Sequence, residues 1–288
     1  MFYLSLILNV IFGVGLLWLG YAVYRSSRKV EQLRKSNAEK ERFGSELRLA
    51  SQIQLSMMPI GHRKTDELEV FGSLVPAREM GGDLFDYYLR DEKLYFFIGD
   101  VCGKGAPAAL LMAYAHSLLW SISQHENNPS LILQEINQVA SRDNDTCTFF
   151  TLFYGVLDLP TGRLDYCNAG HNPPYILGDE VKMLDCESNQ PIGPMEDAEF
   201  ILQTVTLNAG DTIFLYTDGL TEANVTQRHE FGPERTEDVL RQCITRQLLP
   251  EEIINTVTDA VHQFTNHAEQ SDDLTMLAIR YTPKKINQ

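Results

Sequence analysis

The sequence has few cysteines and few basic residues. Its five cysteines are Cys102, Cys147, Cys167, Cys186 and Cys243. None of them forms a CxxC pair, which argues against a disulfide framework and is typical of reduced thiols in a cytosolic domain. Lys and Arg number 24 against 39 Asp and Glu, so the net charge is −15. A chain this acidic is a poor match for nucleic acid, and no nucleic-acid partner is expected.

Residues 1–24 contain no Lys or Arg and are mostly apolar. A helix of this length is about 36 Å long, enough to cross a bilayer. The basic residues Arg25, Arg28 and Lys29 follow the run, which by the positive-inside rule places the rest of the chain in the cytoplasm. We therefore predict a single-pass anchor in the inner membrane over residues 1–24. A cleaved signal peptide is the alternative, although it would have basic residues ahead of a shorter apolar core.

Residues 25–58 contain no proline before Pro59 and are polar with a sparse apolar stripe. The stripe consists of Val30, Leu33, Phe43, Leu47, Ala50, Ile53 and Met57. Three- and four-residue spacing predicts an amphipathic helix, which either pairs with a second copy as a short coiled coil or packs on its own domain. Both alternatives stay open, and a homodimer through this linker is expected from the first.

The chain from residue 59 to 282 predicts one domain of class α+β, followed by a disordered tail over residues 283–288. Helices are expected at 108–124, 130–142, 233–247 and 250–267. Strands are expected within 68–90 as a pair, and at 94–99, 149–157, 164–168, 175–177, 181–184, 199–207, 212–216 and 274–281. Turn sequences such as Pro160-Thr161-Gly162 separate many of these strands, which is typical of antiparallel sheets covered by paired helices.

Acidic residues stand at the ends of four of these strands. They are Asp83 in GGD, Asp100 in GDVCGKG, Asp218 in TDG, and Asp272 and Asp273 in SDD. Each motif alone is more often a turn or a helix cap than a ligand set. Together they offer only oxygen donors, which suit Mg²⁺ or Mn²⁺ rather than zinc. Two such ions would relieve the repulsion among the carboxylates and activate a water for attack on a phosphate ester.

Seven sequence blocks resemble one enzyme family. The blocks are AREMGGDLFDYY at Ala77–Tyr88, GDVCGKGAPAALLM at Gly99–Met112, TFFTLFYGVLDLPTGRLDYCNAGHNPPYIL at Thr148–Leu177, PIG at Pro191–Gly193, GDTIFLYTDGLTEA at Gly210–Ala223, EFGPER at Glu230–Arg235 and SDDLTMLAIRY at Ser271–Tyr281. In order and spacing the chain resembles the metal-dependent protein phosphatases of the PPM (protein phosphatase 2C-like) class, in the bacterial branch of stage II sporulation protein E. The resemblance implies an antiparallel β-sandwich flanked by helices, in the layer order αββα.

The resemblance also implies a role for each acidic residue. Asp100 would bridge two metal ions, and the backbone carbonyl of Val101 would be a further ligand. Asp83 would reach one ion through waters, while Asp218 and Asp272 would hold one ion from the other side. Asp273 stands where relatives have another polar residue and is expected to assist the metal site. Asp100 and Asp218 are the residues on which catalysis is expected to depend most.

The sequence departs from the eukaryotic branch of the family at Cys102, where those relatives have a histidine proposed as the general acid. The proton would then come from water or from another group such as His171, for which a structural role in its loop is the stronger alternative. Lys104 is expected to face the substrate phosphate, although an exposed loop lysine is an equally good interpretation.

The sequence therefore predicts a membrane-anchored serine/threonine phosphatase that uses two Mn²⁺ or Mg²⁺ ions. By resemblance, its substrate is expected to be a phosphorylated regulatory protein of the anti-anti-sigma (STAS) type. The alternative is a non-catalytic docking module that keeps the same fold, which the loss of a metal-binding aspartate would have favoured.

Overall fold

The computed structural model describes residues 2–142, 144, 147–187, 189–226, 229–266, 268 and 270–283, without the side chains at positions 4, 6–8, 10, 11, 14 and 226. The chain divides into two compact units, Met1–Ala50 and Ser51–Gln288. The second unit begins eight residues before the predicted boundary at residue 59, so the end of the linker helix belongs to the folded domain. The predicted tail beyond Pro283 lies outside the described residues.

The first unit is part of one unbroken helix, α1 (Phe2–Ser56). The predicted anchor and linker are therefore a single helix, in which Phe12, Trp18 and Phe43 are exposed. Within the described part of the chain, no helix is long and apolar enough to cross a membrane. The structure thus does not support the predicted transmembrane anchor. Seven of the apolar side chains on which that prediction rests, at positions 4, 6–8, 10, 11 and 14, lie outside the described residues.

The second unit contains two antiparallel sheets. The six-stranded sheet has the order β1 (Gly61–Lys64), β2 (Leu68–Val75), β13 (Leu274–Tyr281), β10 (Thr212–Tyr216), β7 (Tyr175–Leu177) and β8 (Val181–Met183). The five-stranded sheet has the order β3 (Leu84–Arg90), β4 (Lys93–Val101), β5 (Phe150–Asp158), β6 (Arg163–Ala169) and β9 (Gln203–Thr206). Strands far apart in sequence, such as β2 and β13, are neighbours, so the chain must close long loops to form the first sheet.

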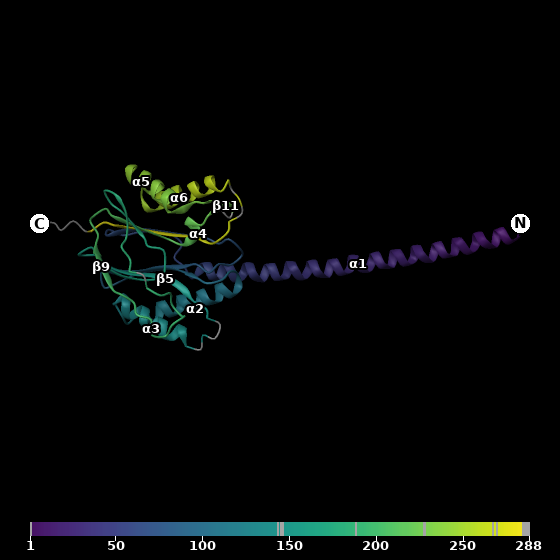
Figure 1. Cartoon of the computed structure of the whole chain (residues 1–288), viewed down its shortest axis with the longest axis horizontal. Coiled ribbons are helices and arrows are strands. Elements are labelled where there is room, and N and C mark those ends of the chain that lie inside the picture. Colours follow the sequence, from purple (N-terminus) through teal and green to yellow (C-terminus); the bar gives the residue numbers. More distant parts are fainter. Residues whose placement is uncertain are drawn as a thin grey trace. The chain divides into compact units, whose positions relative to one another are not determined.

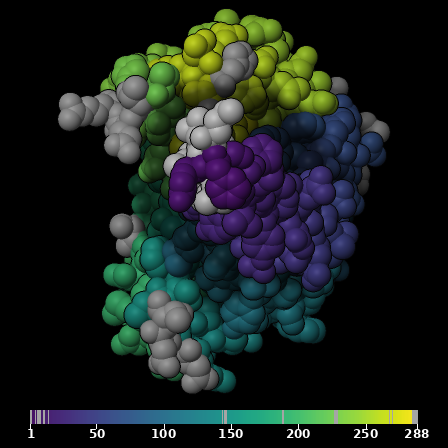
Figure 2. Space-filling view, turned by 90° about the vertical axis from the view of Figure 1, so that its right-hand side faces the viewer, coloured from purple at the N-terminus to yellow at the C-terminus, as the bar shows by residue number. Residues whose placement is uncertain are grey.

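Two pairs of helices cover the sheets on their outer faces, and Figure 1 shows the sheets between the two pairs. The helices are α2 (Ala106–Ser123), α3 (Pro129–Ser141), α5 (Gly232–Thr245) and α6 (Pro250–Phe264). Figure 2 shows the same layers from another side, with the yellow-green residues of α5 and α6 at one edge and the teal residues of α2 and α3 at the opposite edge. The described residues therefore form the predicted αββα sandwich.

Two apolar cores hold these layers together. One lies between the sheets and beneath α2 and α3, with Phe85, Phe96, Phe153 and Ile279 fully buried. The other lies between the six-stranded sheet and the pair α5–α6, and it includes Phe214. Alternate residues of β13 contribute to different cores because successive side chains of a strand point to opposite faces.

Short elements were the ones that the sequence did not predict. They are β1, the one-turn helix α4 (Asp218–Thr221), and the hairpin β11 (Asn224–Thr226) with β12 (His229–Glu230). The sequence of β1 is GHRK, which has neither an apolar run nor an alternating pattern. The predicted strand at 199–207 is shorter than expected, because only Gln203–Thr206 pair with β6.

The antiparallel registers bring four chain segments to one end of the two sheets. Leu274 at the start of β13 is opposite Val75 at the end of β2, and Tyr216 at the end of β10 is opposite Met276. In the other sheet, Leu84 at the start of β3 is opposite Gly99 near the end of β4. The GGD, GDVCGKG, TDG and SDD motifs follow or precede these positions directly. The topology thus gathers the predicted acidic residues.

Candidate active site

Asp83 is the most enclosed carboxylate of the cluster, with 2% of its surface exposed. Its Oδ2 accepts hydrogen bonds from the hydroxyls of Thr217, at 2.8 Å, and Thr275, at 2.5 Å. Burial raises the pKa of Asp83 well above its ordinary value, and the charges of Asp100 and Asp273 raise it further. The two threonines therefore fix the orientation of a carboxyl group whose ionisation the surroundings disfavour.

Asp273 closes the GGD loop onto the SDD segment. Its Oδ1 accepts from the amide of Ala77 at 2.9 Å, and its Oδ2 accepts from the amide of Gly82 at 2.8 Å. A Cβ placed on Gly81 would lie 2.0 Å from Asp273 Oδ2, and one on Gly219 would lie 1.9 Å from the Asp273 carbonyl oxygen. Gly81 and Gly219 are therefore required, because Asp273 occupies the space beside each of them.

Asp100 lies at the end of β4, next to the predicted carbonyl ligand of Val101. A Cβ on Gly82 would lie 2.9 Å from the Val101 carbonyl oxygen, so this oxygen is directed toward the GGD loop. Burial raises the pKa of Asp100 to about 7, and the charges of Asp218, Asp272 and Asp273 add to the effect. Asp100 is thus within the electrostatic reach of the other carboxylates, as the sequence predicted.

Asp218 and Asp272 form the opposite half of the cluster. Asp218 begins α4, and burial together with the charge of Asp272 raises its pKa. The Oδ1 of Asp272 accepts from the amide of Asp273 at 2.9 Å, while its Oδ2 accepts from Lys104 Nζ at 2.5 Å. Lys104 also donates to the carbonyl of Ser271 at 3.0 Å. The lysine expected to face substrate therefore lies on a predicted metal ligand.

The donor set fits divalent cations of the Mn²⁺ or Mg²⁺ type. All five side chains offer oxygen, and the raised pKa values of Asp83, Asp100 and Asp218 show that negative charge is crowded here. Among the described residues, no three His, Cys, Asp or Glu side chains are grouped as a finished metal site. Several carboxylate oxygens instead accept from threonine hydroxyls, backbone amides and Lys104.

His171 lies behind the cluster rather than in it. Its ring is buried, Nδ1 is 2.8 Å from the Thr151 hydroxyl, and Nε2 is 3.2 Å from the Tyr216 carbonyl oxygen. Burial lowers its pKa to about 4. Both ring nitrogens are engaged within the protein, which favours the structural alternative for His171. A contact between His171 and substrate remains a prediction.

Cys102 does not replace the missing histidine. Its Sγ accepts from the amide of Phe149 at 3.2 Å, which directs the sulfur toward the backbone of the adjacent strand. Neither His171 nor Cys102 has a hydrogen bond to a carboxylate of the cluster in the described part of the chain.

Sequence reasoning missed four residues that build or border the site. Thr217 and Thr275 belong to the TDG and SDDLT motifs, and the sequence did not indicate that their hydroxyls donate to Asp83. Gln54, in the last turns of α1, donates from Nε2 to the Gly81 carbonyl at 2.6 Å. Arg78 is exposed, and its charge acts on Lys104. Only the AREMGGD motif offered a signal for Arg78, and nothing in the stripe of α1 indicated Gln54.

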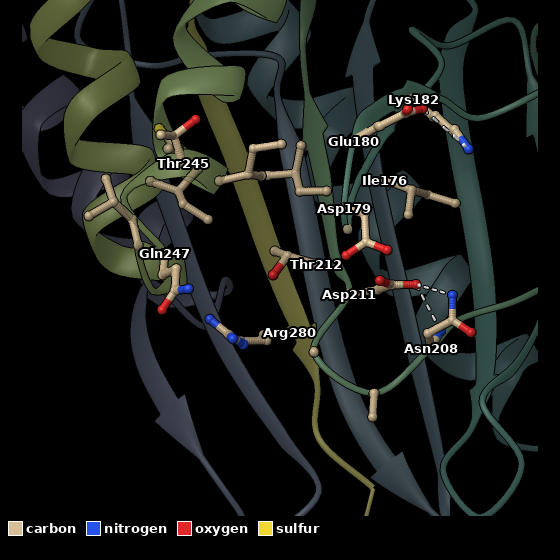
Figure 3. Close-up of a pocket in the computed structure, with 18 of the residues that line it drawn as sticks. Ile176, Asp179, Glu180, Lys182, Asn208, Asp211, Thr212, Thr245, Gln247 and Arg280 are labelled. Atoms are coloured by element: carbon tan, nitrogen blue, oxygen red, sulfur yellow. Dashed lines mark hydrogen bonds and ion pairs between the residues drawn. The ribbon is translucent and has the colours of Figure 1, made fainter.

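A cavity of about 1010 Å³ is at the other end of the six-stranded sheet. It is lined by Thr212 at the start of β10 and Arg280 near the end of β13, whereas Asp218 and Asp273 are at the opposite ends of these strands. Figure 3 shows Arg280 and Gln247 on one side of this cavity and Glu180 and Lys182 on the other. The cavity is therefore separate from the carboxylate cluster.

Residues 90–282 match the family described as stage II sporulation protein E (SpoIIE). The chain belongs to this family. It is 26% identical over 281 residues to the phosphoserine phosphatase RsbU of Bacillus subtilis, covering 96% of this chain and 78% of RsbU. It is 30% identical over 263 residues to protein IcfG of Synechocystis, covering 81% of this chain and 41% of IcfG. The chain therefore spans less than half of IcfG.

Solved structures show the same fold. The SiaA-PP2C domain of Pseudomonas aeruginosa superposes with a TM-score of 0.74 at 23% identity, over 85% of this chain and 99% of that domain. A structure of Bacillus subtilis SpoIIE, comprising the PP2C phosphatase domain and a fragment of the regulatory domain, gives a TM-score of 0.64 at 21% identity, over 77% of this chain and 64% of the other. The sandwich is thus that of PP2C-type domains.

Proposed function

We propose that this chain is a metal-dependent protein serine/threonine phosphatase. The observation that carries the proposal is the convergence of Asp83, Asp100, Asp218 and Asp272 from four separate segments at one end of the sandwich. Membership of the SpoIIE family supports it, and so does the similarity to RsbU, which is named a phosphoserine phosphatase.

Two Mn²⁺ or Mg²⁺ ions would supply charge neutralisation and an activated water at this site. Asp100, Asp218 and Asp272 would hold the ions, with the Val101 carbonyl as a neutral donor. Asp83 would act from a fixed position because Thr217 and Thr275 hold its Oδ2. Asp273 would keep the GGD loop closed through two backbone amides. Holding the ligands in place before the reaction is what gives such a site its catalytic effect.

The proposed reaction also needs a place for the phosphate and a proton for the leaving serine oxygen. Two cations at the rim, Arg78 and Lys104, suit a phosphate dianion. His171 is neutral at pH 7 because burial lowers its pKa to about 4, so it cannot supply the proton. We infer that the proton comes from solvent water, and that Cys102 takes no part.

The proposed substrate is a phosphorylated regulatory protein of the STAS type in a partner-switching pathway. The similarity to RsbU and RsbP, both named phosphoserine phosphatases, supports this class of substrate. One structural neighbour, at 15% identity and a TM-score of 0.55, is described as part of the bacterial stressosome, a modular system that controls secondary messenger signalling.

The function is tested by phosphate release from p-nitrophenyl phosphate and from a phosphoserine peptide, with the full chain, in Mn²⁺ and in excess EDTA. We expect release with Mn²⁺ only, and at least a hundredfold loss in Asp218→Asn. Asp259→Asn, an exposed aspartate on α6, is the matched control and should behave as wild type. Equal release in EDTA, or wild-type turnover of Asp218→Asn, would refute the metal-dependent mechanism. No release above background in Mn²⁺ would favour the docking module.

Location and oligomeric state are further parts of the proposal. We infer attachment to the cytoplasmic face of the inner membrane through residues 1–24, supported by the exposed Phe12, Leu16 and Trp18. We also infer a homodimer through the linker, supported by the exposure of Val30 and Phe43. Two helices held at one membrane would pair even if their intrinsic affinity were weak.

A further inference from the structure

Lys104 stands out in the acidic cluster because it brings a positive charge to the carboxylates. Its ammonium is 2.5 Å from Asp272 Oδ2 and 3.0 Å from the Ser271 carbonyl oxygen. Among the described residues, no other ion pair involves Asp83, Asp100, Asp218, Asp272 or Asp273. The side chains of the pair are 47% and 31% exposed, so the bond is held at the mouth of the site rather than in its interior.

Lys104 is flanked by two glycines that have open space beside them. Gly103 and Gly105 flank it with φ values of 99° and 72°, a region that residues with a Cβ rarely adopt. A Cβ at either glycine would meet no atom within 4 Å, so the space beside both glycines is open. By contrast, Asp272 is fixed at Oδ1 by the amide of Asp273. If the pair separates, it is therefore the lysine that leaves.

Lys104 also offsets part of the negative charge of Asp218 and Asp272. Lys104 donates to Asp272 Oδ2, and the neighbouring carboxylate of Asp218 adds to the negative charge that its ammonium faces. One ammonium cannot neutralise both carboxylates, whereas a divalent ion can. The lysine and a metal ion would thus compete for the same oxygen, Asp272 Oδ2.

We propose that Lys104 is a tethered counter-ion for the Asp218–Asp272 half of the cluster, and that a divalent ion must displace it from Asp272 to bind there. The displaced ammonium, still tethered beside the carboxylates, then faces the substrate phosphate. The second step rests on the proposed phosphatase function, whereas the first does not.

This competition predicts two effects of opposite sign. Removing the ammonium should strengthen metal binding, because the metal no longer has to break an ion pair. A partly exposed pair of this kind contributes up to about 1 kcal/mol, which corresponds to about three- to fivefold in a dissociation constant. The same change should weaken substrate binding and raise KM. A residue with a purely structural role would weaken both.

The test is direct Mn²⁺ binding to the full chain, followed by the electron paramagnetic resonance signal of free Mn²⁺ without substrate. Lys104→Met keeps the length and the apolar stem but removes the charge. We expect its Mn²⁺ dissociation constant to fall about three- to fivefold, with Lys104→Arg close to wild type. Lys182→Met is the matched control because Lys182 is an exposed strand residue 3.6 Å from Glu180, and it should bind Mn²⁺ as wild type does.

A second variant guards against an indirect effect. In an Asp272→Asn background the ion pair is already lost and only the weaker attraction to Asp218 remains, so Lys104→Met should change Mn²⁺ affinity less than it does in wild type. Unchanged or weaker Mn²⁺ binding in Lys104→Met alone, with an unchanged melting temperature in EDTA, would overturn the proposal. An equally large effect in the Asp272→Asn background would overturn it as well.

The two parts of the inference fail separately. If Lys104→Met binds Mn²⁺ more tightly but wild type releases no phosphate, the counter-ion role stands and the proposed function is refuted. If wild type is an active phosphatase and the KM for a phosphoserine peptide does not rise in Lys104→Met, the displaced lysine does not bind phosphate.

Discussion

Replacing Asp100 by asparagine is expected to stabilise the metal-free protein at neutral pH while abolishing Mn²⁺-dependent hydrolysis. Asp100 is crowded by Asp218, Asp272 and Asp273, and together with burial this raises its pKa to about 7. Asparagine has the same shape but no charge, so it removes the repulsion without opening a cavity. A mutation at the centre of a site thus separates function from stability.

The size and sign of the effect follow from proton linkage. In the unfolded chain Asp100 titrates near 3.8, and in the folded protein near 7. Between these values the folded state binds the extra proton, so stability falls as pH rises from about 4 to 7 and stays low above that. The full shift corresponds to about 4 kcal/mol. Because Asp100 keeps some contact with solvent, we expect about 2 kcal/mol.

The assay is urea unfolding in EDTA at pH 4.5 and pH 8 for wild type and Asp100→Asn. The quantity to compare is the difference in the free energy of unfolding between the two proteins, since His171 also titrates. Because its pKa is about 4 in the folded protein, stability is lost as pH falls from about 6.5 to 4. That contribution cancels in the difference. We expect a gain of about 2 kcal/mol at pH 8 and little at pH 4.5. A gain that is the same at both pH values, or a loss at pH 8, would refute the reasoning.

The remaining predictions concern the support of the site, its cofactor and the linker. Gln54→Leu should lower the free energy of unfolding by about 1–2 kcal/mol, because the Gly81 carbonyl loses a buried donor. It should also raise the Mn²⁺ concentration that gives half-maximal activity. Gln52→Leu, on the exposed side of the same helix, should change neither quantity. His171→Gln should lower the melting temperature but leave kcat within about threefold, whereas a catalytic acid would lose about a hundredfold or more. Ca²⁺ should not restore activity after EDTA, because it prefers longer and looser coordination; full activity with Ca²⁺ would contradict the metal assignment. Disulfide cross-linking of Val30→Cys should give a dimer in membranes, and a protein that fractionates away from membranes as a monomer would contradict both inferences about the linker.

Much of the fold was predictable because its strands and helices obey local rules. The turn sequences between residues 149 and 216 predicted antiparallel strands, and the structure contains them in both sheets, with β5, β6 and β9 in one and β7, β8 and β10 in the other. The site was predictable for a different reason. Every aspartate of the cluster lies within two residues of the end of a buried strand, so the predicted strands indicated where the ligands lie.

The partners of these residues could not be predicted, because they depend on contacts between distant segments. Asp273 clamps the amide of Ala77 from 196 positions away, and Lys104 reaches Asp272 from 168 positions away. The linker shows the same limit. In one of the two alternatives its apolar stripe packs on its own domain, but Ile53 is 60% exposed, whereas Gln54 and Met58 are buried.

The buried Gln54 connects these observations. It lies in the last turns of α1, within the second compact unit, and its side chain donates to the Gly81 carbonyl at 2.6 Å. Asp273 also holds this loop, because its Oδ2 accepts a hydrogen bond from the amide of Gly82. The GGD loop is therefore positioned by the linker helix and by the acidic cluster together. A rotation of the end of α1 that broke the Gln54 bond would leave Asp273 alone to hold the loop that carries Asp83, so the packing of this helix is coupled to the arrangement of the metal ligands.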